Sequence, residues 1–258
     1  MRPINTKYKL STEIKAVFFD VDDTLYDHSY HIHQVMTAVR EEFSFLQEFP
    51  IEYLKGLSHQ FLEEVHERLL RGEITVEESR KLRWQKFIEV TGQPNMDALT
   101  LANFYSNSYY KNERAVPGAI ELLQILKGSY TIGIISNNLL DEQLHKMRRI
   151  GITEHIDTFA ISEEVGVAKP DPQIFEVALQ RAGVTADEAL LIGDSWANDI
   201  LGALQVGIRP IWFNRNNTES PDSSIPEISS LTPAKNVLRY IRNESPTPQR
   251  TSVEPASV

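Results

Sequence analysis

Aspartates and a threonine follow the first strongly apolar run of the chain. Residues 16–20 read AVFFD and lead directly into VDDTL, so Asp20, Asp22 and Thr24 come at or just after the end of a predicted strand. In an open parallel sheet, ligands bind at the carboxyl ends of the strands. Two carboxylates two positions apart could act there as a nucleophile and a proton carrier. Turn formation is the alternative, because Asp and Thr are also common after strands, and this motif alone leaves both interpretations open.

A second and a third motif supply groups suited to an anion. The predicted strand TIGIIS ends at Ser136, and Asn137 leads toward a helix, where hydroxyl and backbone N–H groups can bind a phosphate oxygen. Helix capping is the alternative for these two residues. Further along, Lys169 lies in VAKPDP, where Pro170 and Pro172 stiffen the loop. A lysine held in this way could fix a positive charge against a phosphoryl group, whereas a lone lysine is usually solvated.

A fourth motif, LLIGDSWAND, places Asp194 after another predicted strand and Asp199 after a short turn. A second pair of acids at the same sheet edge would crowd like charges against Asp20 and Asp22, which helix capping does not explain. A bound cation would offset the repulsion between these carboxylates. Oxygen ligands suit Mg²⁺, which keeps several waters and takes further oxygens from a substrate phosphate.

The elements that must position these groups alternate between short apolar runs and helical patterns. This alternation is typical of a parallel α/β sheet. The predicted strands are residues 16–20, 131–136, 158–162, 189–193 and 210–213, and the predicted helices between and after them include 119–126, 139–150, 172–182 and 233–241.

Residues 29–112 differ from this pattern, because they contain no convincing strand and repeat apolar residues at helical spacing. Thr75 followed by Glu78 predicts a capping box that starts a helix through Trp84. We therefore expect an all-helical insertion, acting as a lid, within a discontinuous core. That core comprises residues 14–28 and 113–243, and residues 1–13 and 244–258 are predicted to be flexible termini.

Composition narrows the class of protein. The 258 residues are 41% hydrophobic and 24% charged, which is ordinary for a globular protein, and the formal net charge is −10. Such a charge argues against binding a nucleic-acid polymer or an anionic membrane surface. The chain has no cysteine, which excludes disulfides, thiolate metal sites and thiol catalysis. Without an apolar signal-like N-terminus or a membrane-length apolar run, the cytoplasm is the expected compartment.

The four motifs, in this order and on strand ends, resemble the haloacid dehalogenase superfamily of phosphohydrolases across residues 14–213. The phrase ISEEVGVAKPDPQIF, with a helical insertion between the first two motifs, is similar to the subgroup with a C1-type cap. That subgroup includes pyrimidine nucleotide phosphatases and other small-metabolite phosphatases. The resemblance implies an α/β fold, with a Rossmann-like parallel sheet core and an inserted all-helical cap domain.

The resemblance also implies a reaction, the hydrolysis of a small phosphorylated metabolite with Mg²⁺ as cofactor. Asp20 would attack phosphorus in line and form an aspartyl-phosphate. Asp22 would protonate the leaving oxygen and then activate the water that releases phosphate. The Asp20 carboxylate, the Asp22 backbone carbonyl and Asp194 would hold the metal.

The remaining motif residues receive supporting roles from the same resemblance. Ser136 and Lys169 would bind phosphoryl oxygens, and Asp199 would orient Lys169 or a metal-bound water. Thr24 and Asn137 would complete the phosphate-binding part of the site.

Three other functions stay open at this point. A 2-haloacid dehalogenase shares the aspartate nucleophile but needs neither a metal nor an acid at the position of Asp22. A phosphomutase would keep the core motifs and return the phosphoryl group to a sugar. A non-catalytic phosphometabolite-binding protein would show no turnover with Mg²⁺. The physiological substrate and the oligomeric state, including a homo-oligomer, are not determined by the sequence.

Two further groups of residues, one where the predicted insertion begins and one within it, could bind ligands. His28, His31 and His33 lack a common metal-binding face and are expected to form a solvated helix start. Arg83 and Trp84 could recognise a substrate, as could Arg80, although an exposed charged face with Trp84 in the core is the favoured interpretation.

Overall fold

The computed structural model describes residues 13–109, 111 and 113–242. The predicted flexible termini therefore lie outside the described residues, apart from residue 13. The chain divides into two compact units: the first comprises the described residues before Tyr26 and after Arg114, and the second is Tyr26–Arg114.

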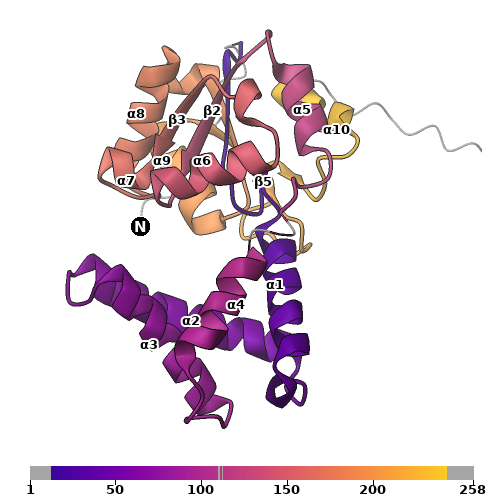
Figure 1. Cartoon of the computed structure of the whole chain (residues 1–258). Helices are drawn as coiled ribbons and strands as arrows, with labels where there is room; N and C mark the ends of the chain where they lie inside the picture. Colours follow the sequence, from indigo (N-terminus) through magenta and orange to yellow (C-terminus); the bar gives the residue numbers. More distant parts are fainter. Residues whose placement is uncertain (1–12, 110, 112, 243–258) are drawn as a thin grey trace, which may run out of the picture. The chain divides into compact units, whose positions relative to one another are not determined.

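The first unit is built on one parallel six-stranded sheet (Figure 1). Its strand order is β3-β2-β1-β4-β5-β6, so the predicted parallel α/β fold is confirmed. Because the order reverses at β1, the crevice in which such sheets bind ligands opens at the carboxyl ends of β1 and its neighbours. The strands are β1 (Ala16–Phe19), β2 (Thr131–Ser136), β3 (Thr158–Ile161), β4 (Ala189–Gly193), β5 (Arg209–Phe213) and β6 (Glu227–Ile228).

The central strands are buried on both faces, as expected for strands covered by helices. Every residue of β1 and β4 is buried, and the two strands pair in register from Ala16 to Phe19. Gly133 of β2 lies opposite Phe18 of β1. A Cβ at Gly133 would come within 2.4 Å of the Phe18 ring, so glycine at this position makes room for that ring.

Helices connect and cover these strands. Helix α8 shows why they form where the sequence predicted: Asp171 caps its start by accepting a hydrogen bond from the Gln173 N–H, and Gly183 ends it in a left-handed conformation. The helices of this unit are α5 (Ala119–Leu126), α6 (Leu140–Arg149), α7 (Ser162–Val165), α8 (Pro172–Ala182), α9 (Leu201–Val206) and α10 (Ala234–Ile241).

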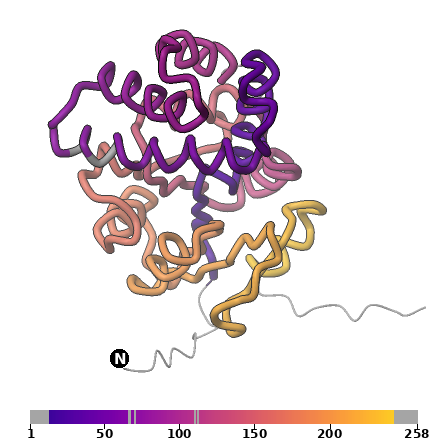
Figure 2. The backbone as a smooth tube through the Cα atoms, turned by 90° about the horizontal axis from the view of Figure 1, so that it is seen from below, coloured from indigo at the N-terminus to yellow at the C-terminus, as the bar shows by residue number. Residues whose placement is uncertain are grey.

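The second unit is built from helices, which Figure 2 traces from indigo to magenta. Its core includes Leu54, Trp84 and Phe87, all buried and separate from the core around the sheet. The predicted capping box at Thr75 and Glu78 is present, with both of its hydrogen bonds formed. The four long helices are α1 (His28–Glu42), α2 (Ile51–Leu70), α3 (Val76–Val90) and α4 (Ala98–Tyr109).

Two expectations about this second unit can be checked directly. The solvated helix start predicted for the histidines is wrong for His31, which is fully buried with its ring centroid 4.4 Å from that of Tyr109. Trp84 lies in the core as expected, and the Arg83 guanidinium stacks over its ring at 4.7 Å.

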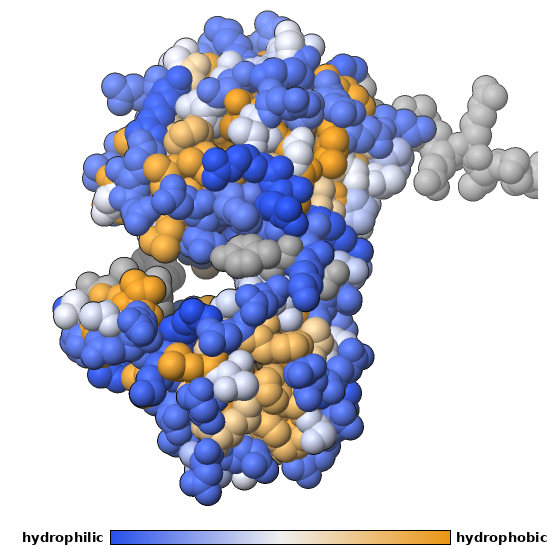
Figure 3. Space-filling view, viewed as in Figure 1, coloured by the Kyte–Doolittle hydropathy of each residue, from blue (hydrophilic) through white to orange (hydrophobic). Residues whose placement is uncertain are grey.

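The surface is largely polar on the face that Figure 3 shows. Among the residues that the structure describes, no helix combines the length and the apolar character needed to cross a membrane.

Candidate active site

The sequence motifs meet at the carboxyl edge of the sheet. Asp20 follows β1 directly, and its backbone N–H donates to the Ile192 carbonyl of β4 at 3.0 Å. Ser136 is the last residue of β2, and Asp194 follows the last residue of β4. Lys169 lies in the loop that leads into α8. Adjacent parallel strands thus deliver an acid, a hydroxyl and a second acid to one crevice.

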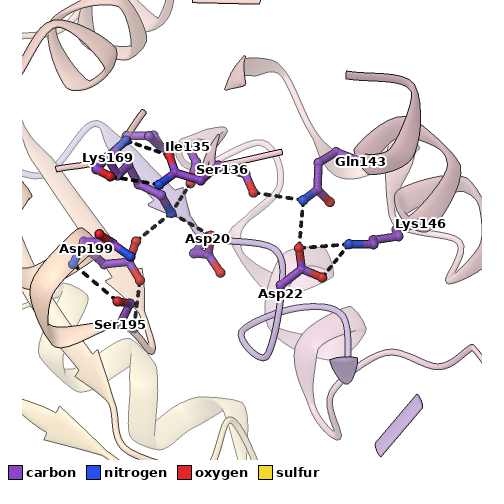
Figure 4. Close-up of polar contacts among 11 residues, drawn as sticks. Asp20, Asp22, Ile135, Ser136, Gln143, Lys146, Lys169, Ser195 and Asp199 are labelled. Carbon is purple, nitrogen blue, oxygen red and sulfur yellow. Dashed lines mark hydrogen bonds and ion pairs between the residues drawn. The ribbon is translucent and has the colours of Figure 1, made fainter. Parts of the chain in front are cut away.

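Lys169 is the hub of this cluster, as Figure 4 shows. Its Nζ donates to Asp20 Oδ1 at 2.6 Å, to Asp199 Oδ1 at 2.6 Å and to the Ile135 carbonyl at 2.8 Å. All three side chains are buried. Three acceptors match the three donors of an ammonium group, so Lys169 is fixed in position although lysine side chains are rarely buried.

The main chain of Lys169 is held as firmly as its ammonium group. The Asn137 side chain donates from Nδ2 to the Lys169 carbonyl at 2.9 Å, and its Oδ1 accepts from the Lys169 N–H at 2.6 Å. Both polar atoms of this amide are therefore used on the loop, and the structure places Asn137 as a support for Lys169.

Asp199 uses both of its carboxylate oxygens. Oδ1 accepts from Lys169, and Oδ2 accepts from the Ser195 backbone N–H at 2.9 Å. The chain forms a single π-helical turn from Trp196 to Ile200, and this turn brings Asp199 back onto the end of β4. A Cβ at Gly193 would lie 2.4 Å from the Asp199 carboxyl carbon, so only glycine at that position allows this close approach.

Three carboxylates converge within this cluster. One oxygen each of Asp20, Asp194 and Asp199 lies within 4.8 Å of the other two, so the group could hold a metal ion. Burial and the nearby carboxylates, foremost Asp199, raise the pKa of Asp20 well above its ordinary value against the opposing effect of Lys169. Burial, with Asp199 and Asp23, likewise raises the pKa of Asp194 to about 7.

The carboxylates that contact Lys169 determine the direction in which its pKa is shifted. Burial alone would lower it, but the carboxylates of Asp199 and Asp20 outweigh burial and raise the pKa of Lys169. The lysine is therefore a permanent cation. A single cation does not balance three clustered carboxylates, and this excess of oxygen ligands fits a hard divalent ion.

Asp22 makes contacts that sequence reasoning did not anticipate. Lys146 donates to both of its carboxylate oxygens, at 2.7 and 2.9 Å, and Gln143 Nε2 donates to Oδ2 at 2.8 Å. The same Gln143 nitrogen lies 3.1 Å from Ser136 Oγ. A detectable signal was present, because Gln143 and Lys146 share one face of a helix with Met147 and Ile150, at positions where apolar residues are usual.

The buried Thr24 stands apart from these contacts. Its side chain is fully buried, and its hydroxyl has no hydrogen-bond partner among the described residues. The structure therefore does not connect Thr24 to the other predicted site residues through a side-chain hydrogen bond.

One carboxylate oxygen of Asp20 remains available to react with a substrate. Lys169 engages Oδ1, while Oδ2 accepts no hydrogen bond from any residue that the structure describes. In Figure 4 this second oxygen points away from Lys169. Asp20 thus offers a positioned carboxylate oxygen, beside a fixed cation and a second carboxylate, Asp22, whose side chain is 28% exposed.

Comparisons with known proteins identify the family of this chain. The family model for haloacid dehalogenase-like hydrolases matches residues 14–207. The pyrimidine 5'-nucleotidase YjjG of Escherichia coli is 30% identical over 232 residues, which cover 86% of this chain and 96% of the relative. A glyceraldehyde 3-phosphate phosphatase of Methanothermobacter thermautotrophicus is 32% identical over 212 residues, covering 80% of this chain and 88% of the relative.

Among solved structures, the HAD-hydrolase YfnB of Bacillus subtilis, bound to magnesium, is similar in fold. Its TM-score is 0.67 at 23% identity, over 90% of this chain and 100% of that one.

Proposed function

We propose that this chain, which belongs to the haloacid dehalogenase-like hydrolases, hydrolyses small phosphate monoesters with Asp20 as the nucleophile and Mg²⁺ as the cofactor. The class of enzyme agrees with the relatives, whose names describe a nucleotidase and a sugar phosphate phosphatase. Nucleoside monophosphates and short sugar phosphates are therefore the first substrates to test. The observation that carries the assignment of Asp20 is its buried carboxylate, fixed by Lys169 at one oxygen and open at the other.

The proposed reaction has two halves, both centred on phosphorus. In the first, an Asp20 carboxylate oxygen forms a bond to phosphorus, the bond to the leaving oxygen breaks, and Asp22 gives that oxygen a proton. In the second, Asp22 removes a proton from water as the water oxygen attacks phosphorus. The acyl phosphate bond then breaks, and Asp20 is regenerated as inorganic phosphate leaves.

Lys169 and Ser136 bind the oxygens of the phosphoryl group in the proposed reaction. The ammonium of Lys169 is a fixed charge that need not reorganise while negative charge develops on phosphoryl oxygens, which is the source of most electrostatic catalysis. The Ser136 hydroxyl lies at the end of the neighbouring strand, on the side of the crevice where Asp22 and Gln143 meet. Asp199 and Asn137 act indirectly, by holding Lys169.

The carboxylates of Asp20 and Asp194, with the Asp22 backbone carbonyl, would hold Mg²⁺. When bound, the ion supplies positive charge that screens the carboxylates from an anionic substrate and polarises the phosphate. The fit rests on the chemistry of the donors, since three carboxylates cluster around one buried lysine that pairs with only two of them, Asp20 and Asp199. A dehalogenase or a binding protein would not require this cluster together with Asp22.

A panel of phosphate esters tests the proposal. With Mg²⁺, the parent protein should release phosphate from at least one nucleoside monophosphate, sugar phosphate or short phosphoacid. Excess chelator should abolish this activity, and Mg²⁺ should restore it. Asp20→Asn should lose activity to the uncatalysed background, because an amide is a poor nucleophile.

Asp222→Asn is the matched control, since Asp222 is an exposed aspartate outside the site. It should keep the parental rate. Full activity in chelator would remove the metal from the mechanism, and phosphate release by Asp20→Asn at the parental rate would remove Asp20.

A further inference from the structure

Helix α6 carries two buried polar side chains that the proposed reaction does not yet use. Gln143 is 0% exposed and Lys146 is 2% exposed. Together with Met147 and Ile150 they form the inward stripe of the helix, at spacings of three, four and seven residues. Burying an ammonium and an amide in such a stripe is costly unless both are well paired.

Both side chains converge on one carboxylate, that of Asp22. Lys146 Nζ bridges its two oxygens, at 2.7 and 2.9 Å, and Gln143 Nε2 adds a third hydrogen bond to Oδ2 at 2.8 Å. Figure 4 shows them reaching Asp22 from one helix, on the side opposite the cluster around Lys169. The contacts span more than 120 residues of sequence, so α6 and the loop after β1 are joined at this point.

The pair also leaves Asp22 available to react. Its side chain keeps 28% of its surface exposed, whereas the Lys146 side chain keeps 3%. Gln143 in addition contacts Ser136 Oγ at 3.1 Å, so one amide connects the proposed phosphate-binding hydroxyl with the proposed proton carrier. Three hydrogen bonds from two side chains therefore hold a carboxylate that is still partly exposed.

We propose that Lys146 and Gln143 are positioning residues that hold the Asp22 carboxylate in the orientation needed for proton transfer. The inference rests on the proposed function, because it assigns these residues a role through Asp22. Neither residue touches the reacting atoms in this account. Asp22 must serve the leaving oxygen and then a water, and a carboxylate free to change rotamer would meet each of them less often. Displacement of a catalytic group by about 1 Å can cost on the order of 10²-fold in rate.

The test compares Lys146→Gln, Lys146→Arg and Gln143→Met with the parent, using an alkyl phosphate and an aryl phosphate. Lys146→Gln should lower kcat for the alkyl phosphate by roughly 10- to 100-fold with little change in KM. The loss should be smaller for formation of the phosphorylated enzyme from the aryl phosphate, whose leaving group needs little acid assistance. Lys146→Arg should recover most of the rate, and Gln143→Met should show a smaller loss of the same kind.

A double-mutant cycle separates positioning from a merely structural role. In the Asp22→Asn background, Lys146→Gln should change the rate at which the phosphorylated enzyme breaks down by less than about threefold, because its target has already been removed. Arg148→Gln is the matched control, since Arg148 is an exposed cation on the same helix, and it should leave activity unchanged. Thermal unfolding of each variant shows whether the fold is kept, and Gln143→Met carries the test if Lys146→Gln does not fold.

Equal losses in the parent and Asp22→Asn backgrounds would overturn the inference, and so would a rise in KM with kcat unchanged. Phosphate release by the parent protein is measured first. Its absence would refute the proposed function itself, whereas an active parent with unaffected Lys146 and Gln143 variants would refute only the positioning role.

Discussion

Among the individual residues of the site, the negative charges of the carboxylates exceed the positive charge of the one lysine beside them. Asp20, Asp194 and Asp199 lie together, and one ammonium, that of Lys169, contacts two of them. Asp199 has both oxygens occupied and serves the lysine. Burial raises the pKa of both Asp20 and Asp194, and the nearby Asp199 carboxylate raises each of them further. The metal-free protein should therefore hold protons at this site that a bound divalent cation would displace.

This balance predicts how the stability of the metal-free protein depends on pH. The pKa of Asp194 is raised from its ordinary value of 3.8 to about 7 in the folded state. Between these values the folded state binds more protons than the unfolded chain, so raising the pH destabilises the fold. In chelator, Tm should fall as the pH rises from about 4 to about 7, by about 2 to 4 °C for each 1 kcal/mol lost.

Asp194→Asn provides the comparison for this thermal unfolding series. The variant should show a shallower fall of Tm over the same pH range, because it lacks one of the titrating groups. Added Mg²⁺ should flatten the curve of the parent, since binding to the folded state offsets the cost of ionisation. Identical slopes for parent and variant would show that Asp194 does not titrate in this range.

The missed residues show where reasoning from sequence stops at this scale. The sequence predicted the site residues that lie at a strand end or in a loop flanked by prolines. These are Asp20, Asp22, Ser136, Lys169 and Asp194. Their meeting follows from the topology of a parallel sheet. Gln143 and Lys146 share a helix face with Met147 and Ile150, and this spacing signals burial without showing what the two polar side chains contact. Only the packing of α6 against the β1 loop reveals that both face a carboxylate.

At the scale of elements, strands and helices were predicted well where they are buried and apolar. The strand at residues 189–193 and the helix at residues 172–182 were placed with their observed bounds, because burial selects apolar runs and caps mark the helix ends. The sixth strand, β6, was not predicted. It comprises two residues within a polar, turn-rich segment, and its pairing depends on the neighbouring β5 rather than on its own sequence.

The same dependence on tertiary context explains the error at His31. A histidine at the start of an exposed helix is usually solvated, and periodicity alone gave no reason to bury this one. In the structure Tyr26 and Tyr109 lie against its ring, with centroids 5.7 and 4.4 Å away. Tyr109 is distant in sequence, so the contact could be inferred only once α1 and α4 were known to pack together.

At the scale of the whole molecule, the chain forms two units, each with its own core. The two crossings between them are tied locally: Arg114 donates to Asp27 Oδ2 at 2.9 and 2.6 Å within the helical unit, and the Val116 N–H donates to the Leu25 carbonyl within the other. The helical unit has a hydrophobic core separate from the one around the sheet, which carries the proposed catalytic groups. We propose that it acts as the cap that selects the substrate.

Exchange of residues 29–112 for the equivalent segment of a family member with a different preferred ester tests this role. The exchange keeps Asp27 and Arg114, so both crossings stay tied. The ranking of substrates in the phosphate-release panel should change, whereas dependence on Mg²⁺ and on Asp20 should not. An unchanged ranking would place substrate choice in the unit that contains the sheet.

The proposed mechanism depends on phosphorylation of Asp20, which the Asp22→Asn variant should make observable. This variant keeps the nucleophile but lacks the group that activates water, so breakdown of the acyl phosphate should slow by on the order of 10² to 10⁴. After reaction with an aryl phosphate and an acid quench, peptide mass spectrometry should find one phosphoryl group per protein on Asp20, removable by hydroxylamine. Phosphate on any other residue, or a burst of leaving group with no covalent phosphate, would show that Asp20 is not the nucleophile.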